Sequence, residues 1–163
     1  MYRPKLDIKL EFIDLLIEII GAIALIIMIA LLIMNYGDLP ETIPIHFNAS
    51  GEVNGWSHKS AIWTLPTIGA IVYVVLFALN KSPHTFNYLV KITEENAYRQ
   101  YQLASRMIRI LNASIAALFA YISYNLIELA FGNKGGSLNL LWISLGFTVC
   151  ILGAYLYFAI KEQ

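Results

Sequence analysis

The stretch LLIEIIGAIALIIMIALLIM, residues 15–34, holds one charged side chain, Glu18, among 20 positions. A helix needs roughly 20 mostly apolar residues to cross the hydrocarbon core of a bilayer. A helix of a soluble bundle would keep a polar face, and residues 21–32 offer none. The stretch therefore predicts a transmembrane helix.

Three further apolar stretches are long enough to span a membrane, at residues 61–79, about 107–131 and about 138–160. Hydrophobic residues make up 58% of the 163 residues and charged residues 13%. In soluble domains, apolar residues average roughly 45–50% and charged residues about 25%. In lipid a spanning segment has to satisfy its own backbone hydrogen bonds, which favours helices. We predict an all-α membrane protein, a four-transmembrane-helix bundle that forms a single domain over residues 1–163.

Basic residues are distributed unevenly among the connecting segments. Residues 35–60 contain only Lys59. Most others precede the first span, lie between the second and third, or lie at the entry into the third: Arg3, Lys5, Lys9, Lys81, Lys91, Arg99, Arg106 and Arg109. Lys and Arg near spans concentrate on the cytoplasmic side. This predicts a multi-pass protein of a bacterial inner or plasma membrane, with both termini cytoplasmic and an outer loop at 35–60.

Residues 80–106 are typical of a cytoplasmic amphipathic segment leading into the third span. Thr93, followed by Glu94 and Glu95, favours a helix N-cap with acidic residues in the first turn. Neither Gly nor Pro occurs from Glu94 to Phe131. We therefore expect one helix of about 38 residues, roughly 57 Å long, whose first third extends into the cytoplasm.

The outer loop shows a period of two. Apolar side chains alternate with other types in the series Ile43, Pro44, Ile45, His46, Phe47, Asn48. This alternation favours an extended segment with one apolar face. Residues 49–52 and the pair Asn54-Gly55 provide turn chemistry. We expect a compact folded loop, with a short β-hairpin as one form of it.

These loop residues resemble a known family. The matching positions are Leu39-Pro40, residues 43–47, Gly51, Asn54-Gly55-Trp56 and Lys59. The set is similar to domain-of-unknown-function family 1648, a membrane module that also forms the N-terminal part of SdpI-type immunity proteins. Residues 86–88 and 91–101 are similar to a stretch of stand-alone members. Many members have Asp where this chain has Asn54, and this chain is too short for the further C-terminal spans of an SdpI-type immunity protein. The resemblance implies, by analogy, a role in immunity to a toxic peptide.

Three groups of candidate site residues follow. Partner recognition is assigned to the outer loop: Pro40, Pro44, His46, Phe47, Asn48, Gly51, Asn54, Trp56 and Lys59. Polar residues inside the membrane are Asn112, Tyr124, Asn125 and Glu128. The cytoplasmic face is assigned Asn87, Tyr88, Glu95, Asn96, Arg99 and Tyr101. Tyr88, Tyr98 and Tyr101 are expected to anchor in the lipid headgroups.

Several roles have alternatives. His46 could titrate near neutral pH, bind a metal, or make a structural hydrogen bond in the loop. Glu128 could form a proton- or ligand-linked site with Lys59, His46 or His58, or could simply reach water near the helix end.

A stripe of acidic residues precedes and enters the first span. Asp7, Glu11, Asp14 and Glu18 recur at helical spacing. The stripe could dock on Arg99, Arg106 or Arg109, or it could remain a solvated face.

No phosphate-binding loop, nucleophile elbow or metal-ligand spacing occurs in the sequence. We therefore expect no enzymatic activity, no cofactor, no metal and no nucleic-acid partner. The leading hypothesis is a membrane protein whose outer loop recognises a peptide, another membrane protein or the state of the envelope. The alternative is a small transporter or channel subunit that acts as a homo-oligomer, with Asn112, Asn125 and Glu128 lining its path.

Overall fold

The computed structural model describes residues 3–48, 52–133 and 139–162, with the side chains of the last segment described from residue 143 onward. In chain order the elements are α1 (Phe12–Asn35), β1 (Thr42–Phe47), β2 (Val53–His58), the 3₁₀ helix η1 (Lys59–Trp63), α2 (Thr64–Leu79), the 3₁₀ helix η2 (Pro83–Thr85), α3 (Ala97–Ala130) and α4 (Asn139–Lys161).

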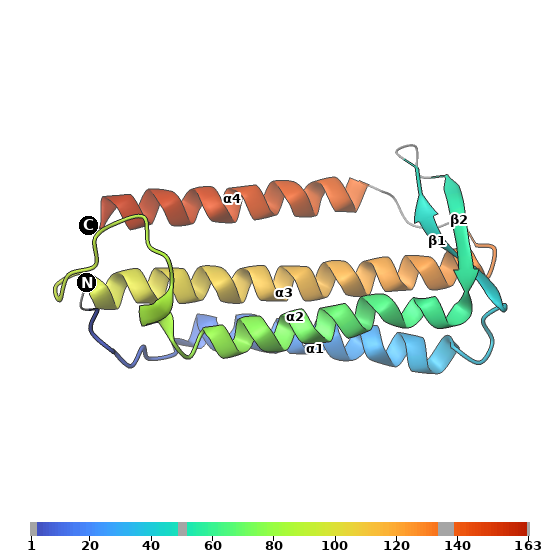
Figure 1. Ribbon diagram of the computed structural model, residues 1–163, viewed down its shortest axis with the longest axis horizontal. Coiled ribbons are helices and arrows are strands. Elements are labelled where there is room, and N and C mark those ends of the chain that lie inside the picture. Colours follow the sequence, from blue (N-terminus) through green and yellow to red (C-terminus); the bar gives the residue numbers. More distant parts are fainter. Residues whose placement is uncertain (1–2, 49–51, 134–138, 163) are drawn as a thin grey trace.

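The four α-helices lie side by side along the long axis of the molecule (Figure 1). Four helical segments are long and apolar enough to cross a membrane: α1, η1 together with α2, α3, and α4 from Ile143. Both termini lie at one end of the bundle, here called the terminal end, and the β-hairpin lies at the other, the hairpin end. The predictions of four membrane-length helices and of a hairpin between the first two are confirmed.

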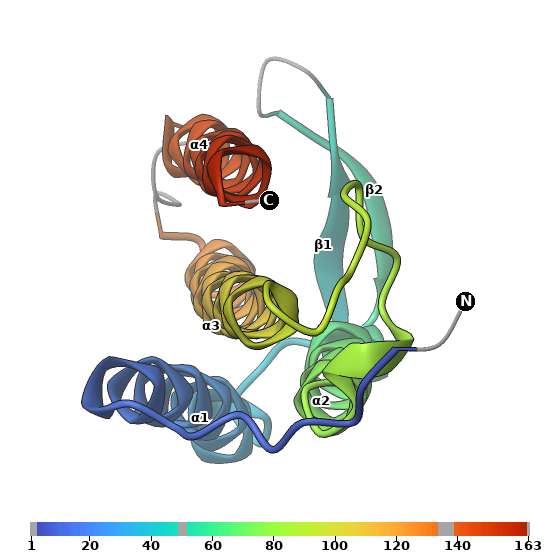
Figure 2. The same ribbon diagram turned by 90° about the vertical axis from the view of Figure 1, so that its left-hand side faces the viewer.

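Helix α3 is the centre of the bundle. Viewed from the terminal end, it lies between α4 on one side and the pair α1 and α2 on the other (Figure 2), and it packs against all three. Close approach of α1 depends on Gly21, since a Cβ atom added there would be 3.1 Å from the Cα of Ala113. In α4, Gly146 and Gly153 have no other group within 4 Å of such a Cβ.

The long third helix begins one turn later than the sequence predicts. Helix α3 has 34 residues, or roughly 51 Å. The N–H of Asn96 donates to Oγ1 of Thr93 at 3.3 Å, and the N–H of Thr93 donates to Oδ1 of Asn96 at 2.9 Å. This reciprocal pair closes a turn over residues 94–96, so the predicted helix start at Glu94 is wrong.

The second span has two parts instead of one. Residues 59–63 form a 3₁₀ helix, and the α-helix starts at Thr64. Pro66 therefore falls in the first turn of α2, where its missing N–H would have had no partner in the helix. The predicted single helix over residues 61–79 is corrected accordingly.

The hairpin deviates from the predicted alternation. The antiparallel register shifts between Pro44 and His46 and again between His46 and Phe47. Ile43 and Pro44 are both buried, whereas Ile45 is 45% exposed. The first shift is a β-bulge that leaves Ile45 as an extra residue in β1. The apolar side chains of the strand therefore do not all lie on one face. The prediction that the alternating apolar residues Ile43, Ile45 and Phe47 share one face is therefore wrong for Ile45.

Candidate functional site

The hairpin is attached to the end of the bundle through a small apolar core. Ile43 of β1 is fully buried with Leu32 of α1, Ile62 of η1, and Leu126 and Ile127 of α3. A two-stranded hairpin is marginally stable by itself in water. Packing on three helical elements therefore holds β1 across the helix ends.

Ionic contacts fix the base of the hairpin, where β1 begins and β2 ends. Nζ of Lys59 lies 2.9 Å from Oε1 of Glu41, and Nε2 of His58 lies 3.1 Å from Oε2 of Glu41. The Lys59 ammonium also lies 5.6 Å from the centre of the Tyr36 ring. The hydrogen bond from Lys59 lowers the pKa of the Glu41 carboxyl, and His58 adds to this effect.

His46 makes a side-chain hydrogen bond within the hairpin. Its Nδ1 is bonded to Oδ1 of Asn54 on the opposite strand. The amide oxygen of Asn54 can accept this bond from the imidazole N–H, so the Asp found at this position in many family members is not required for it. No group of three or more His, Cys, Asp or Glu side chains in the described ranges could hold a metal ion.

Gly55, which belongs to the family-like motif but was predicted to form a turn, has a different role in the structure. It pairs with His46 across the two strands. A Cβ atom at Gly55 would lie 2.8 Å from the Cβ of His46. The predicted turn at Asn54-Gly55 is wrong, because both residues lie inside β2. Gly is needed here for the close approach of the two strands.

The remaining candidates of the outer loop differ in how far they are buried. Trp56 is 61% exposed, and Pro40 is also exposed. Phe47 and Asn48 are half-buried, and Asn48 exchanges hydrogen bonds with Glu52. Gly51 lies outside the described residues. The outer face thus presents an aromatic side chain among polar ones.

At the terminal end, the acidic stripe docks on α3. Asp14 and Glu11 bond Arg106, at 2.8 Å from Oδ1 to Nε and 2.7 Å from Oε2 to Nη2. Glu18 bonds Nε of Arg109 at 2.8 Å, and Glu11 also accepts a hydrogen bond from Gln102. We call these six side chains the acid–arginine ladder: Glu11, Asp14, Glu18, Gln102, Arg106 and Arg109. Docking of the stripe is confirmed for its last three members, whereas Asp7 is exposed.

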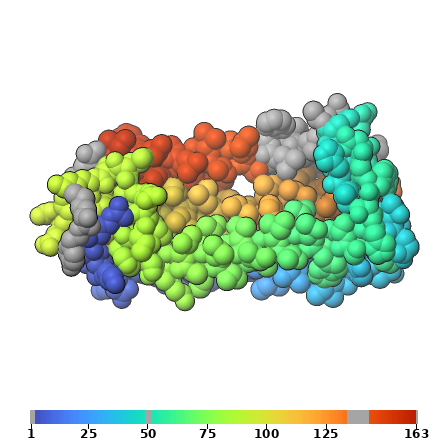
Figure 3. Space-filling model, viewed as in Figure 1, coloured from blue at the N-terminus to red at the C-terminus, as the bar shows by residue number. Residues whose placement is uncertain are grey.

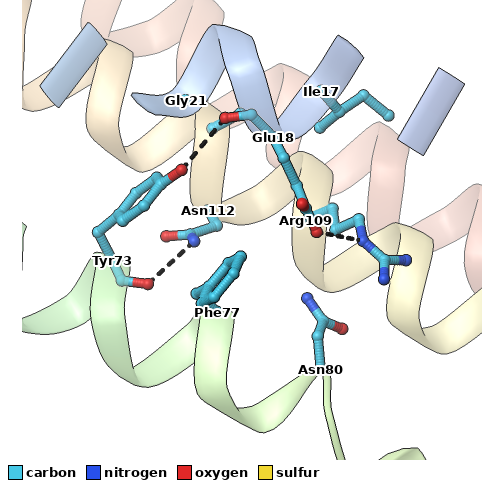
Figure 4. A pocket seen from close by; sticks show the side chains of 9 residues that line it. Ile17, Glu18, Gly21, Tyr73, Phe77, Asn80, Arg109 and Asn112 are labelled. Atoms are coloured by element: carbon cyan, nitrogen blue, oxygen red, sulfur yellow. Dashed lines mark hydrogen bonds and ion pairs between the residues drawn. The ribbon is translucent and has the colours of Figure 1, made fainter. Parts of the chain in front are cut away.

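Beside the ladder, polar groups of three helices surround a cavity of about 10 Å³ (Figure 4). The hydroxyl of Tyr73 donates to the backbone oxygen of Glu18 at 3.1 Å, and Asn112 Nδ2 donates to the backbone oxygen of Tyr73 at 3.1 Å. The Oδ1 atoms of Asn80 and Asn112 are buried without a hydrogen-bond partner among the described groups. A space of this size holds about one water molecule. The two hydrogen bonds of Tyr73 and Asn112 join α1, α2 and α3 around it.

The predicted intramembrane polar residues do not gather. Asn112 faces α2, whereas Tyr124 is exposed on α3, and Asn125 donates to the backbone oxygen of Tyr121 at 2.8 Å. Glu128 accepts a hydrogen bond from Asn133 at 2.9 Å.

Of the two alternatives for Glu128, the described contacts do not include a pairing with Lys59, His46 or His58. Lys59 and His58 contact Glu41, and His46 contacts Asn54.

A second apolar cluster forms at the terminal end, here called the terminal hub. Tyr101 is fully buried with Ile92 and Ala97, and Leu6, Ile8, Tyr88 and Val90 pack around them. Arg3 donates to the backbone oxygens of His84 and Phe86 and lies 5.5 Å from the centre of the Tyr88 ring. Burial raises the pKa of Tyr88.

The packing of the terminal hub differs from the prediction for two tyrosines of the cytoplasmic face. The assignment of Tyr88 and Tyr101 as headgroup anchors is wrong, because their rings pack against each other at 5.4 Å. Asn87 and Glu95 are exposed, and Asn96 belongs to the turn before α3. Arg99 binds Glu162 beyond α4 through two hydrogen bonds, at 2.7 and 2.9 Å.

The hairpin with its flanking helices also carries the family signal. Residues 23–70 match the family model described as Domain of unknown function (DUF1648). The resemblance predicted from the outer loop is thereby confirmed. A search of curated proteins and a search of solved structures gave no significant match.

The DUF1648 segment runs from the middle of α1 through the hairpin and η1 to the first half of α2. It contains all outer-loop candidates and the part of the hairpin core that lies before α3. It ends before the terminal hub, so the similarity predicted for residues 86–88 and 91–101 stays a prediction. The chain thus combines four membrane-length helices with a segment, residues 23–70, that is similar to DUF1648 and includes the hairpin.

Proposed function

We propose that this protein is a non-enzymatic recognition protein of the cell membrane, whose hairpin binds a partner on the outer side. The unequal distribution of Lys and Arg supports this orientation, because it favours a cytoplasmic terminal end. The hairpin end then faces the exterior. The partner is a peptide or another membrane protein.

The observation that carries the proposal is the position of Trp56 on an anchored hairpin. Burial of Ile43 fixes one side of the hairpin to the bundle, while Trp56 of β2 remains 61% exposed. Trp is enriched among the residues that dominate binding energies at protein interfaces. A Trp on a fixed backbone loses little conformational freedom on binding, which favours affinity.

Helix α3 offers a path from the hairpin to the other end of the molecule. Leu126 and Ile127 contact the hairpin core, and Arg106 and Arg109 of the same helix bind the ladder acids. Tyr101, one turn further, is the centre of the terminal hub. A partner that displaces the hairpin would therefore act on a helix that also positions α1 and the hub.

The resemblance to SdpI-type immunity proteins supports a narrower form of the proposal. A toxic peptide would be the ligand of the hairpin, or envelope stress would be the stimulus. The anchored hairpin is suited to both, because it exposes the aromatic side chain of Trp56 together with polar side chains such as Glu41 and His58.

The transporter alternative has less support. Seen along α3, Asn125 lies roughly 220° from Asn112 and Glu128 roughly 160° from it, at 3.6 residues per turn. Residues on nearly opposite sides of one helix cannot line a single path within one copy of the chain, so this alternative depends entirely on a homo-oligomer in which different copies contribute Asn112 and Glu128.

Substitution of Trp56 tests the proposal. Bacteria that produce wild-type protein or the Trp56→Ala variant are challenged with a panel of cationic membrane-active peptides. We expect the variant to lose the survival advantage at equal protein levels in the membrane. The Leu89→Ala variant, which removes an exposed apolar side chain near the terminal hub, serves as the control. Equal survival of Trp56→Ala and wild type against every peptide would sink the proposal.

A further inference from the structure

The outer edge of β2 is the outermost part of the hairpin. In both ribbon views β1 lies between the helices and β2 (Figures 1 and 2), and the hairpin covers one end of the space-filling surface (Figure 3). Within the residues that the structure describes, the sheet has only these two strands. The edge of β2 that faces away from β1 therefore has no neighbouring strand.

The register shows which backbone groups point to that edge. The N–H of Lys59 donates to the backbone oxygen of Glu41 at 2.9 Å. This bond brackets the pair Thr42 and His58, so the pair itself is not hydrogen-bonded. Hydrogen-bonded and open pairs alternate along an antiparallel ladder. Ser57 therefore points its N–H and C=O toward β1, while Trp56 points both of its groups, and His58 its N–H, to the outer edge.

The opposite edge of the sheet is closed. β1 carries Pro44, which has no N–H, at the position that pairs with Trp56. β1 also packs on the bundle through Ile43. Natural sheets protect edge strands with Pro, Lys or coverage by other elements. The sequence of β2, Val53–His58, contains neither Pro nor Lys, so only this edge is open to another strand.

We infer that β2 receives an extended peptide segment of a partner protein as a third strand. The inference rests on the proposed function and specifies the chemistry of its ligand. The N–H and C=O of Trp56 and the N–H of His58 can pair with an extended backbone, which is the basis of strand addition, whereas the C=O of His58 accepts the first hydrogen bond of η1. In the added strand, the side chain opposite Trp56 would lie beside the indole. An apolar residue is preferred at that position, because apolar and aromatic cross-strand pairs are favourable.

Selection from a random nonapeptide library displayed on phage tests the inference. The target is the full chain in lipid nanodiscs. Enriched peptides are expected to alternate apolar and polar residues and to slow hydrogen exchange of the Trp56 and His58 amides at least about tenfold.

Two variants separate strand addition from binding to the indole alone. Trp56→Val removes the ring and keeps the N–H, and Trp56→Pro removes both. Neither touches the bonds of Ser57 to β1, and protection of the Ser57 and Lys59 amides shows that the hairpin remains folded. We expect the selected peptides to bind Trp56→Val at least about tenfold more tightly than Trp56→Pro.

The outcomes are distinct. Equal binding to both variants, protection of β1 amides instead, or no enriched peptide overturns strand addition. Protection of the same amides by a second copy of the chain, without peptide, also overturns it in favour of edge-to-edge dimers. Loss of survival in Trp56→Ala together with equal peptide binding to Val and Pro variants would leave the proposed function standing and remove only this inference.

Discussion

The carboxylate of Asp14 accepts two hydrogen bonds from the guanidinium of Arg106, at 2.8 Å from Nε and 3.1 Å from Nη2. Asp14 is only 1% exposed, and it also accepts the N–H of Glu11 at 3.1 Å. A bidentate contact of this kind fixes both distance and orientation. It therefore sets how far α1 is shifted along α3, from one end of the bundle to the other.

Asp14→Asn is expected to destabilise the protein by about 3 kcal/mol, because Arg106 then loses its buried partner. Glu11 still contacts Arg106, which keeps the loss at the lower end of the range for broken buried pairs. Thermal unfolding in detergent, followed by circular dichroism, measures the change. Asp7→Asn is the control, since Asp7 belongs to the same stripe in the sequence and is exposed. Equal melting temperatures for the two variants would contradict the role of Asp14.

The ladder shows what the sequence could predict and what it could not. Helical spacing placed Glu11, Asp14 and Glu18 on one face, because that depends only on the period of the α-helix. Whether this face meets Arg106 or water depends on which helices are neighbours. Periodicity within one segment does not contain that information.

The misassigned residues have local causes. Ile45 is exposed because an extra residue in β1 reverses the alternation after Pro44. Tyr101 is buried because Leu6 and Ile8, in the segment of residues 3–10, pack over the start of α3. Residues 3–10 are short and charged, and their pattern does not predict that they pack there. Glu128 contacts Asn133, five residues away, since the chain turns at Gly132 with a positive φ of 80°.

Gly21→Ala is expected to lower stability by about 1–3 kcal/mol through overpacking. The added methyl group would lie 3.1 Å from both the Cα of Ala113 and the ring of Tyr73. The backbone of Ala113 cannot turn away as a side chain could, so α1 and α3 must separate. The melting temperature in detergent is again the measurement. Gly146→Ala, with no group within 4 Å of its Cβ, should leave stability unchanged or raise it slightly.

Acidification is expected to loosen the base of the hairpin. The Lys59 ammonium lowers the pKa of Glu41 below its ordinary value of 4.5, so ionised Glu41 stabilises the folded hairpin. This contribution is fully present above pH 4.5 and is lost as the pH falls through the lower folded value. The protection factor of the Lys59 amide, measured by hydrogen exchange, should fall in that window. Glu41→Gln should remove the pH dependence and Glu52→Gln should keep it; a dependence that survives Glu41→Gln would assign the effect to another group.

The orientation of the hairpin is tested by labelling single cysteines in intact cells. The background variant is Cys150→Ala, because the native thiol is exposed on α4. Glu52→Cys lies at the start of the described part after the hairpin tip, and Lys91→Cys lies in the exposed loop of the terminal end. A charged maleimide that does not cross membranes should label position 52 in intact cells and position 91 only after permeabilisation, since basic residues concentrate at the terminal end. The opposite pattern would place the hairpin in the cytoplasm, where Trp56 could not meet a partner from outside.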